Sequence, residues 1–124
     1  MSTILVVDDE AAIREIVSRY LSRNGYAVVA VGEASEALAR LSAPGQRVDL
    51  LLTDLTMPGM SGRTLIERAR ALDPELRVIC MSGYAERAPA GDASAAPAAN
   101  YIEKPFSLGT LGRLVRATLD APAA

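Results

Sequence analysis

The sequence contains no histidine and no tryptophan, and only one cysteine and one phenylalanine among its 124 residues. The missing histidine excludes Ser-His-Asp and Cys-His catalysis, His-ligated zinc, and phosphohistidine chemistry carried by this chain. The single cysteine, Cys80, excludes an intramolecular disulfide and a multi-cysteine metal site, and its apolar neighbours predict a small buried hydrophobe. Because 50% of the residues are hydrophobic but only 4% are aromatic, the core must be aliphatic.

Clustered positive charge is also missing. The formal net charge is −2, and no run of Lys or Arg occurs, which argues against a nucleic-acid-binding surface. No apolar stretch approaches the ~20 residues of a membrane span, and Asp8 and Asp9 cut the first apolar run short of a signal peptide. We therefore expect a cytoplasmic protein with no membrane contact, folded as one domain over residues 1–124.

Short apolar runs alternate with amphipathic helical patterns along the chain. Strands are expected at residues 3–7, 27–31, 48–53, 77–81 and 100–103, and helical patterns lie at residues 13–21, 34–41, 65–72 and 107–119. This alternation predicts an α/β fold, a parallel sheet with helices on both faces. Residues 85–99 hold no large aliphatic side chain and are interrupted by proline and glycine, so we expect a fourth helix that is short or disordered.

Chemically reactive side chains follow four of the five expected strands. They are Asp8 and Asp9 after the first, Asp54 after the third, Ser82 after the fourth and Lys104 after the fifth. The second strand ends at Gly32 with no such group. Because the carboxyl ends of parallel strands meet at one edge of the sheet, these side chains are expected to converge in one crevice.

Three carboxylates close together repel one another and require a cation. Oxygen ligands without His or Cys favour a hard ion, so we expect Mg²⁺, with Mn²⁺ as a substitute. A carboxylate such as Asp54 can act as the nucleophile that accepts a phosphoryl group, with Lys104 and Ser82 stabilising the phosphoryl oxygens. Each residue alone also has an ordinary interpretation, as a helix cap, a turn residue or a solvated charge.

Four ordered motifs carry a resemblance to a known family. They are LVVDDE at residues 5–10, LLTDLTMPGMSG at 51–62, MSGY at 81–84 and YIEKPF at 101–106. From one end to the other, the chain resembles the receiver domain of two-component response regulators. The resemblance implies a flavodoxin-like, doubly wound sheet of five parallel strands in the order 2-1-3-4-5, with five helices.

The resemblance also implies a role for each matching residue. Asp54 would be the phosphoacceptor, with Lys104 contacting the phosphoryl group. The Mg²⁺ ligands would be Asp9, Asp54, the backbone carbonyl of Thr56, and Asp8 through a metal-bound water. Ser82 and Tyr101 would form the switch, and Thr56 and Tyr84 would tune the rate of dephosphorylation.

The function implied is a phosphorylation switch. A sensor histidine kinase or a histidine phosphotransfer protein would supply the phosphoryl group. The chain would catalyse its own phosphorylation and slow dephosphorylation, without turning over an external substrate. The altered surface around the fourth helix, fifth strand and fifth helix would contact a downstream protein, and the chain would be a monomer or a weak phosphorylation-dependent dimer with no DNA-binding output.

Several alternatives remain open from the sequence. The chain could serve as a phosphorelay shuttle or as the receiver module of a hybrid histidine kinase. It could be a pseudo-receiver that binds proteins without taking phosphate. A magnesium phosphohydrolase would need an acid where Thr56 stands, and a nucleotide or flavin binder would need a Gly-rich loop where Asp8 and Asp9 stand.

Overall fold

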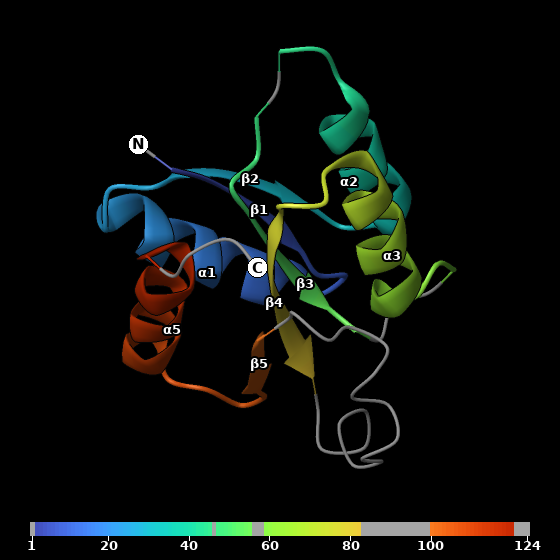
Figure 1. Ribbon diagram of the computed structural model, residues 1–124. Coiled ribbons are helices and arrows are strands. Elements are labelled where there is room, and N and C mark those ends of the chain that lie inside the picture. The colour runs from blue at the N-terminus through green and yellow to red at the C-terminus, as the bar shows by residue number, and fades with distance from the viewer. Residues whose placement is uncertain (1, 46, 56–58, 83–99, 121–124) are drawn as a thin grey trace.

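The computed structural model describes residues 2–45, 47–55, 59–82 and 100–120. At its centre is a parallel five-stranded sheet (Figure 1). The strands are β1 (Thr3–Val7), β2 (Ala27–Val31), β3 (Leu50–Asp54), β4 (Arg77–Ser82) and β5 (Asn100–Glu103). Their order in the sheet is β2-β1-β3-β4-β5, with every neighbouring pair parallel. The expected α/β class and the strand order 2-1-3-4-5 are therefore confirmed.

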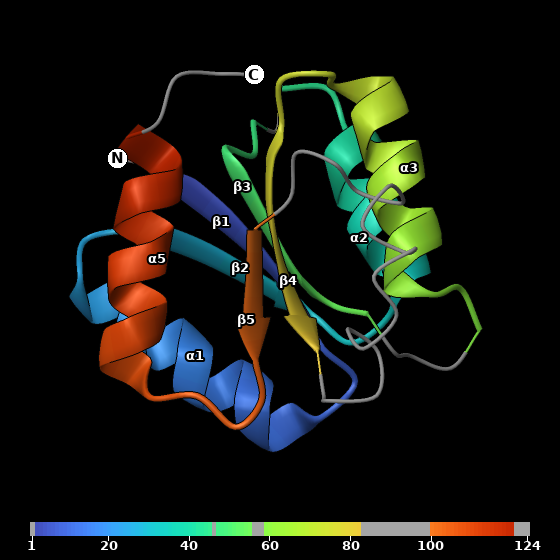
Figure 2. The ribbon, with the colours of Figure 1, turned by 60° about the horizontal axis from the view of Figure 1, so that its bottom comes forward.

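Helices cover both faces of the sheet (Figure 2). They are α1 (Ala11–Arg23), α2 (Ala34–Ser42), α3 (Gly62–Leu72) and α5 (Leu108–Asp120). The pair α1 and α5 lies on one face and the pair α2 and α3 on the other. The predicted short or disordered fourth helix falls at residues 85–99, outside the described residues. None of the described helices has the length and apolarity needed to cross a bilayer.

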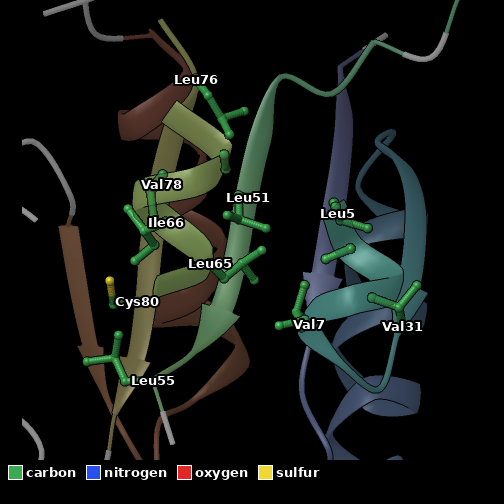
Figure 3. Close-up of a cluster of buried hydrophobic side chains, with 13 residues drawn as sticks. Leu5, Val7, Val31, Leu51, Leu55, Leu65, Ile66, Leu76, Val78 and Cys80 are labelled. Carbon is green, nitrogen blue, oxygen red and sulfur yellow. The ribbon is translucent and has the colours of Figure 1, made fainter. Parts of the chain in front are cut away.

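The strands are apolar on both faces because each face is covered by a helix layer. In β1, Leu5 and Val7 pack toward α2 and α3, whereas Ile4 and Val6 pack toward α1 and α5. Figure 3 shows the first of these clusters, in which α3 side chains point onto the strands. Cys80 belongs to that cluster and is fully buried, and burial raises the pKa of its thiol to about 12, so the expectation of a buried hydrophobe is confirmed.

Two strand boundaries differ from the prediction. Strand β3 begins at Leu50 rather than at residue 48 and includes Asp54, which pairs in register with Met81. Before the strand, the Asp49 carboxylate accepts a hydrogen bond of 2.8 Å from the Thr3 amide, so a side chain takes the place of one ladder bond. Strand β4 extends one residue further than expected, to Ser82. Asp54 and Ser82 are thus held by the sheet itself rather than by the loops that follow.

The helical pattern over-predicts burial at two positions. Ile16 and Leu72 fit the apolar faces expected for α1 and α3, yet they are 54% and 52% exposed. Each lies at the margin of its apolar stripe, beyond the reach of the sheet. Local signals mark the helix ends: Asn24 and Gly25 end α1, with Gly25 at a φ of 94°, and the Ser107 hydroxyl caps α5 by accepting from the Thr110 amide.

The two glycines in α5, Gly109 and Gly112, lie in different surroundings. A Cβ at Gly112 would lie 2.6 Å from the Tyr20 hydroxyl of α1, so this glycine lets the two helices approach. A Cβ at Gly109 would meet only the end of the Arg113 side chain, at 3.7 Å. The first glycine is required by packing, and the second only weakens the helix.

We expect Gly109→Ala to raise the free energy of unfolding by about 0.5–1 kcal/mol, because alanine restricts the unfolded chain and favours helix. Gly112→Ala should instead lower it by about 1–3 kcal/mol through overpacking against Tyr20. Urea unfolding measures both. In a Tyr20→Ala background the Gly112→Ala change should cease to destabilise, and equal effects of Gly112→Ala in both backgrounds would contradict this account.

Candidate functional site

The carboxyl edge of the sheet collects the reactive residues that follow the strands. Asp8 and Asp9 directly follow β1, Asp54 ends β3, Ser82 ends β4, and Lys104 directly follows β5. The parallel register brings these ends together although they are up to 96 residues apart in sequence. The convergence expected from the alternating pattern is therefore present.

Three carboxylates form the centre of the site. Asp8, Asp9 and Asp54 each offer an oxygen, and these oxygens all lie within 4.8 Å of one another. Asp8 is fully buried and Asp54 is 5% exposed, whereas Asp9 is exposed. Burial weakens solvent screening, so the repulsion between these charges costs several kcal/mol unless a cation neutralises it.

Lys104 supplies part of that neutralisation. Its ammonium lies 3.0 Å from Asp8 Oδ2, 3.2 Å from Asp54 Oδ2 and 3.7 Å from Glu10 Oε1. Burial alone would lower the pKa of Lys104, but its hydrogen bonds and charge attraction to Asp8 and Asp54 outweigh this and raise the pKa. The stability that this pairing contributes is thus fully present at neutral pH and is lost only as the pH rises through the raised pKa, above 10.5.

Glu10 is a member of the site that the sequence prediction missed. It is exposed, and its carboxylate completes a third ion pair with Lys104. The sequence could have indicated this role, because Glu10 directly follows Asp8 and Asp9 and a third consecutive acid must lie near the first two.

Asp8 is held from several sides rather than serving as an ordinary helix cap. Its Oδ1 accepts a hydrogen bond of 2.9 Å from the Glu10 amide, and its Oδ2 accepts from Lys104. Within the part of the chain that is described, the Asp9 carboxylate accepts no hydrogen bond. The two neighbouring acids therefore differ: Asp8 has protein partners on both oxygens, and Asp9 keeps both of its oxygens available.

The backbone of Asp54 is fixed by a close approach of α3. The Gly62 amide donates to the Leu55 carbonyl at 3.0 Å, and a Cβ at Gly62 would collide with the Asp54 carbonyl oxygen. Only glycine allows the first residue of α3 to lie against the end of β3. At Gly62 the chain is therefore again in close contact with the end of β3.

Ser82 presents a buried hydroxyl at the same edge. The residue is 0% exposed, and its Oγ has no hydrogen-bond partner among the described residues. Its backbone carbonyl accepts a hydrogen bond of 2.8 Å from the Lys104 amide, which ties the two strand ends together. A buried hydroxyl without a partner is costly, so its presence here fits a site that binds a hydrogen-bond acceptor.

Tyr101 is not part of the acidic cluster. It lies in β5 in register with Cys80 and packs, half-buried, against the apolar cluster on the α2 and α3 face. Thr56 and Tyr84, for which the sequence predicted a metal-ligating carbonyl and rate tuning, lie outside the described residues.

The donor set fits a hard divalent cation. All candidate ligands are oxygens, the three carboxylates lie close enough to share one ion, and Asp9 has free lone pairs. Mg²⁺ is typically bound by one or two carboxylates, with water and phosphate oxygens completing the octahedron. The site also places an ammonium beside the acid that would react, which is the charge pattern that phosphoryl transfer requires.

Comparison with known proteins gives a consistent result. The family model described as the response regulator receiver domain matches residues 4–116. The chain is 37% identical over 119 residues to the sensor kinase CckA of Brucella abortus, covering 96% of this chain but 13% of that kinase. It is 34% identical over 111 residues to the response regulator receiver protein CpdR of the same organism, covering 90% of this chain and 91% of that protein.

A solved structure shares the fold. The response regulator receiver protein from Sinorhizobium medicae superimposes with a TM-score of 0.84 at 28% identity, covering 97% of this chain and 95% of that one. The similarity spans the sheet and the helices described above.

If the acidic cluster binds Mg²⁺, the ion should raise the free energy of unfolding, by about 2.7 kcal/mol at 100 times its Kd. Asp9→Asn should abolish this gain. Without Mg²⁺ the same variant should be more stable than the parent protein, because one of three repelling charges is removed. Thermal or urea unfolding with and without Mg²⁺ measures both effects.

Asp120→Asn, an exposed change of the same chemistry at the end of α5, is the matched control and should keep the full gain from Mg²⁺. An Asp9→Asn variant that Mg²⁺ stabilises as much as the parent protein would contradict the assignment.

Proposed function

Because this chain belongs to the response regulator receiver domain family, we propose that it is a two-component phosphorylation switch in which Asp54 accepts the phosphoryl group. Receiver domains generally bind Mg²⁺ at an acidic pocket and interact with histidine kinases or phosphotransfer proteins. The observation that carries the proposal is the Lys104 ammonium bridging Asp8 and Asp54, with Asp9 alongside. The proposal treats residues 1–124 as one receiver domain acting in the cytoplasm.

Asp9, Asp54 and the Thr56 carbonyl would hold the metal ion directly, and Asp8 would act through a water bound to it. Asp8 already has protein partners on both oxygens, whereas the Asp9 carboxylate accepts no hydrogen bond from the described residues, which supports this division. Mg²⁺, when bound, neutralises the carboxylates and the charge on the phosphoryl oxygens. Mn²⁺ would serve in the same place.

The reaction transfers one phosphoryl group without a change of oxidation state. An Asp54 carboxylate oxygen attacks phosphorus, the bond from phosphorus to the imidazole nitrogen of the donor histidine breaks, and the electron pair of that bond returns to the imidazole. The Lys104 ammonium lies 3.2 Å from Asp54 Oδ2, so it is placed to contact an oxygen of the incoming phosphoryl group. The buried Ser82 hydroxyl, which has no hydrogen-bond partner among the described residues, would donate to another phosphoryl oxygen.

That new hydrogen bond is the proposed source of the switch. Drawing the end of β4 toward the phosphoryl group alters the packing around Tyr101 on the neighbouring strand β5. The changed surface around the fourth helix, β5 and α5 then binds a downstream protein. Thr56 and Tyr84 would set the access of water for slow self-dephosphorylation, so the chain catalyses only its own modification.

We expect incubation with acetyl phosphate and Mg²⁺ to add one phosphoryl group, detected by intact mass, and Asp54→Asn to abolish the addition because the nucleophile is lost. Asp120→Asn should accept the group at the parent rate. Phosphorylation that persists in Asp54→Asn, or that does not occur in the parent protein, would overturn the proposed function.

A groove beside the site suits the protein that donates the phosphoryl group. It lies between α1 and the segment entering α5, has a volume of about 470 Å³, and is lined mainly by apolar side chains that include Ile13, Ile16 and Phe106. Glu10 and Lys104 form its border with the acidic cluster. A helix of a kinase or phosphotransfer protein docked there would hold its phosphohistidine next to Asp54, with the exposed Ile16 as an anchor.

Ile16→Asp should slow transfer from a phosphohistidine protein by about tenfold or more, equivalent to about 1.4 kcal/mol of lost docking energy. It should leave phosphorylation by acetyl phosphate unchanged, because the small donor needs no docking surface. Leu72→Asp is the matched control, since Leu72 is equally exposed but ends α3, on the other face of the sheet. Equal effects of the two substitutions on protein-to-protein transfer would contradict the assignment of this groove.

A second role is supported by the similarity to CckA, where this chain matches only 13% of the length. The chain would then act as the receiver module of a hybrid histidine kinase or as a phosphorelay shuttle. In that role the phosphoryl group passes on to a histidine phosphotransfer protein. Rapid loss of phosphate from Asp54 on mixing with such a protein distinguishes this role from a direct contact switch.

A further inference from the structure

Arg14 makes a contact that no step of the proposed chemistry uses. It is the fourth residue of α1, and its Nη1 donates a hydrogen bond of 2.7 Å to the backbone carbonyl of Asp8. The backbone amide of Asp8 donates a hydrogen bond of 3.2 Å to the Val31 carbonyl. The backbone of Asp8 is therefore held on one side by the edge strand β2 and on the other by a charged side chain of α1.

The position of the guanidinium depends on Gly32, the residue after β2. A Cβ built on Gly32 would lie 3.0 Å from Arg14 Nη1 and 3.5 Å from Arg14 Cζ. Gly32 does not have a positive φ, so its backbone conformation does not require glycine. The absence of a side chain at Gly32 instead leaves space for the Arg14 guanidinium. The end of β2 bears no reactive group, but it thereby contributes to the position of Arg14.

We propose that Arg14 is a positioning residue for the cation-binding acids, and that Gly32 provides the space in which it works. The carbonyl that Arg14 holds belongs to the peptide joining Asp8 to Asp9. Fixing that peptide sets the direction in which Asp9, exposed and without a hydrogen-bond partner of its own among the described residues, presents its carboxylate. The inference rests on the proposed function, because it assigns how the metal-binding half of that site is held.

Removing Arg14 would change the affinity for Mg²⁺ in opposite directions, depending on whether its positive charge or its positioning of the ligands dominates. A positive charge near three carboxylates weakens their attraction for Mg²⁺, so its removal by itself would tighten binding. Loss of a group that orients metal ligands weakens binding, typically by about 10–100-fold. The sign of the change in Kd for Mg²⁺ therefore separates the two effects.

The experiment measures Mg²⁺ binding by calorimetry and the acetyl phosphate reaction at saturating Mg²⁺. Arg14→Ala should raise the Kd for Mg²⁺ by about tenfold, the low end for a group that acts through a ligand's backbone. Arg14→Lys keeps the charge but loses the planar guanidinium, and should recover only part of the affinity. The rate at saturating Mg²⁺ should change less than the Kd, because Arg14 does not touch the reacting atoms.

Gly32→Ala tests the same geometry from β2 without altering any charge. The added methyl group should displace the guanidinium and raise the Kd for Mg²⁺ in the parent protein. In an Arg14→Ala background it should have no further effect, because the side chain it displaces is gone. Arg19→Ala, which removes an exposed arginine of the same helix that pairs with Glu15, should leave the Kd unchanged.

Tighter or unchanged Mg²⁺ binding in Arg14→Ala would overturn the inference, as would full affinity in Arg14→Lys or additive effects of Gly32→Ala and Arg14→Ala. Failure of the parent protein to bind Mg²⁺ would also overturn it. If the parent protein binds Mg²⁺ but takes no phosphoryl group from acetyl phosphate, only the proposed function is refuted. The Kd values for Mg²⁺ of the Arg14 variants would still test the role of Arg14.

Discussion

The structure depends on placing like charges together at one edge of a hydrophobic sheet. Asp8 and Asp54 are buried at the carboxyl ends of the neighbouring strands β1 and β3, and a single ammonium from Lys104 lies between them. One positive charge cannot neutralise the set once Asp9 and Glu10 are included, so the site retains an excess of negative charge. That excess is what makes the site receptive to a divalent cation and, with it, to a phosphoryl group.

The surrounding fold keeps this arrangement from relaxing. Strand pairing carries Asp54 and Ser82 to the ends of β3 and β4, and Gly62 lets α3 lie against the Asp54 backbone. The Asp8 backbone is bound by Val31 on one side and Arg14 on the other. Such support from neighbouring elements is what a site of repelling charges needs, because each charged side chain alone would turn toward water.

The layout of the sheet was predictable because the signals are local or additive. Apolar runs marked the strands, and their alternation with helices predicted a parallel sheet whose strand ends meet at one edge. The strand order itself came from the resemblance to the receiver family. The rest depends on contacts between distant segments: the packing of Tyr20 against Gly112, the exposure of Ile16, and the space that Gly32 leaves for Arg14. Gly112 and Gly32 leave space for Tyr20 and Arg14 of α1, and this role is visible only once α1 is packed in place.

The most direct test of the central claim is a crystal structure with Mg²⁺ and beryllofluoride, which mimics a phosphoryl group on a carboxylate. We expect beryllofluoride joined to a carboxylate oxygen of Asp54 and contacted by Lys104 and Ser82. We also expect Mg²⁺ about 2.1 Å from oxygens of Asp9 and Asp54. Beryllofluoride absent from Asp54, or Mg²⁺ bound away from these acids, would contradict the proposed function.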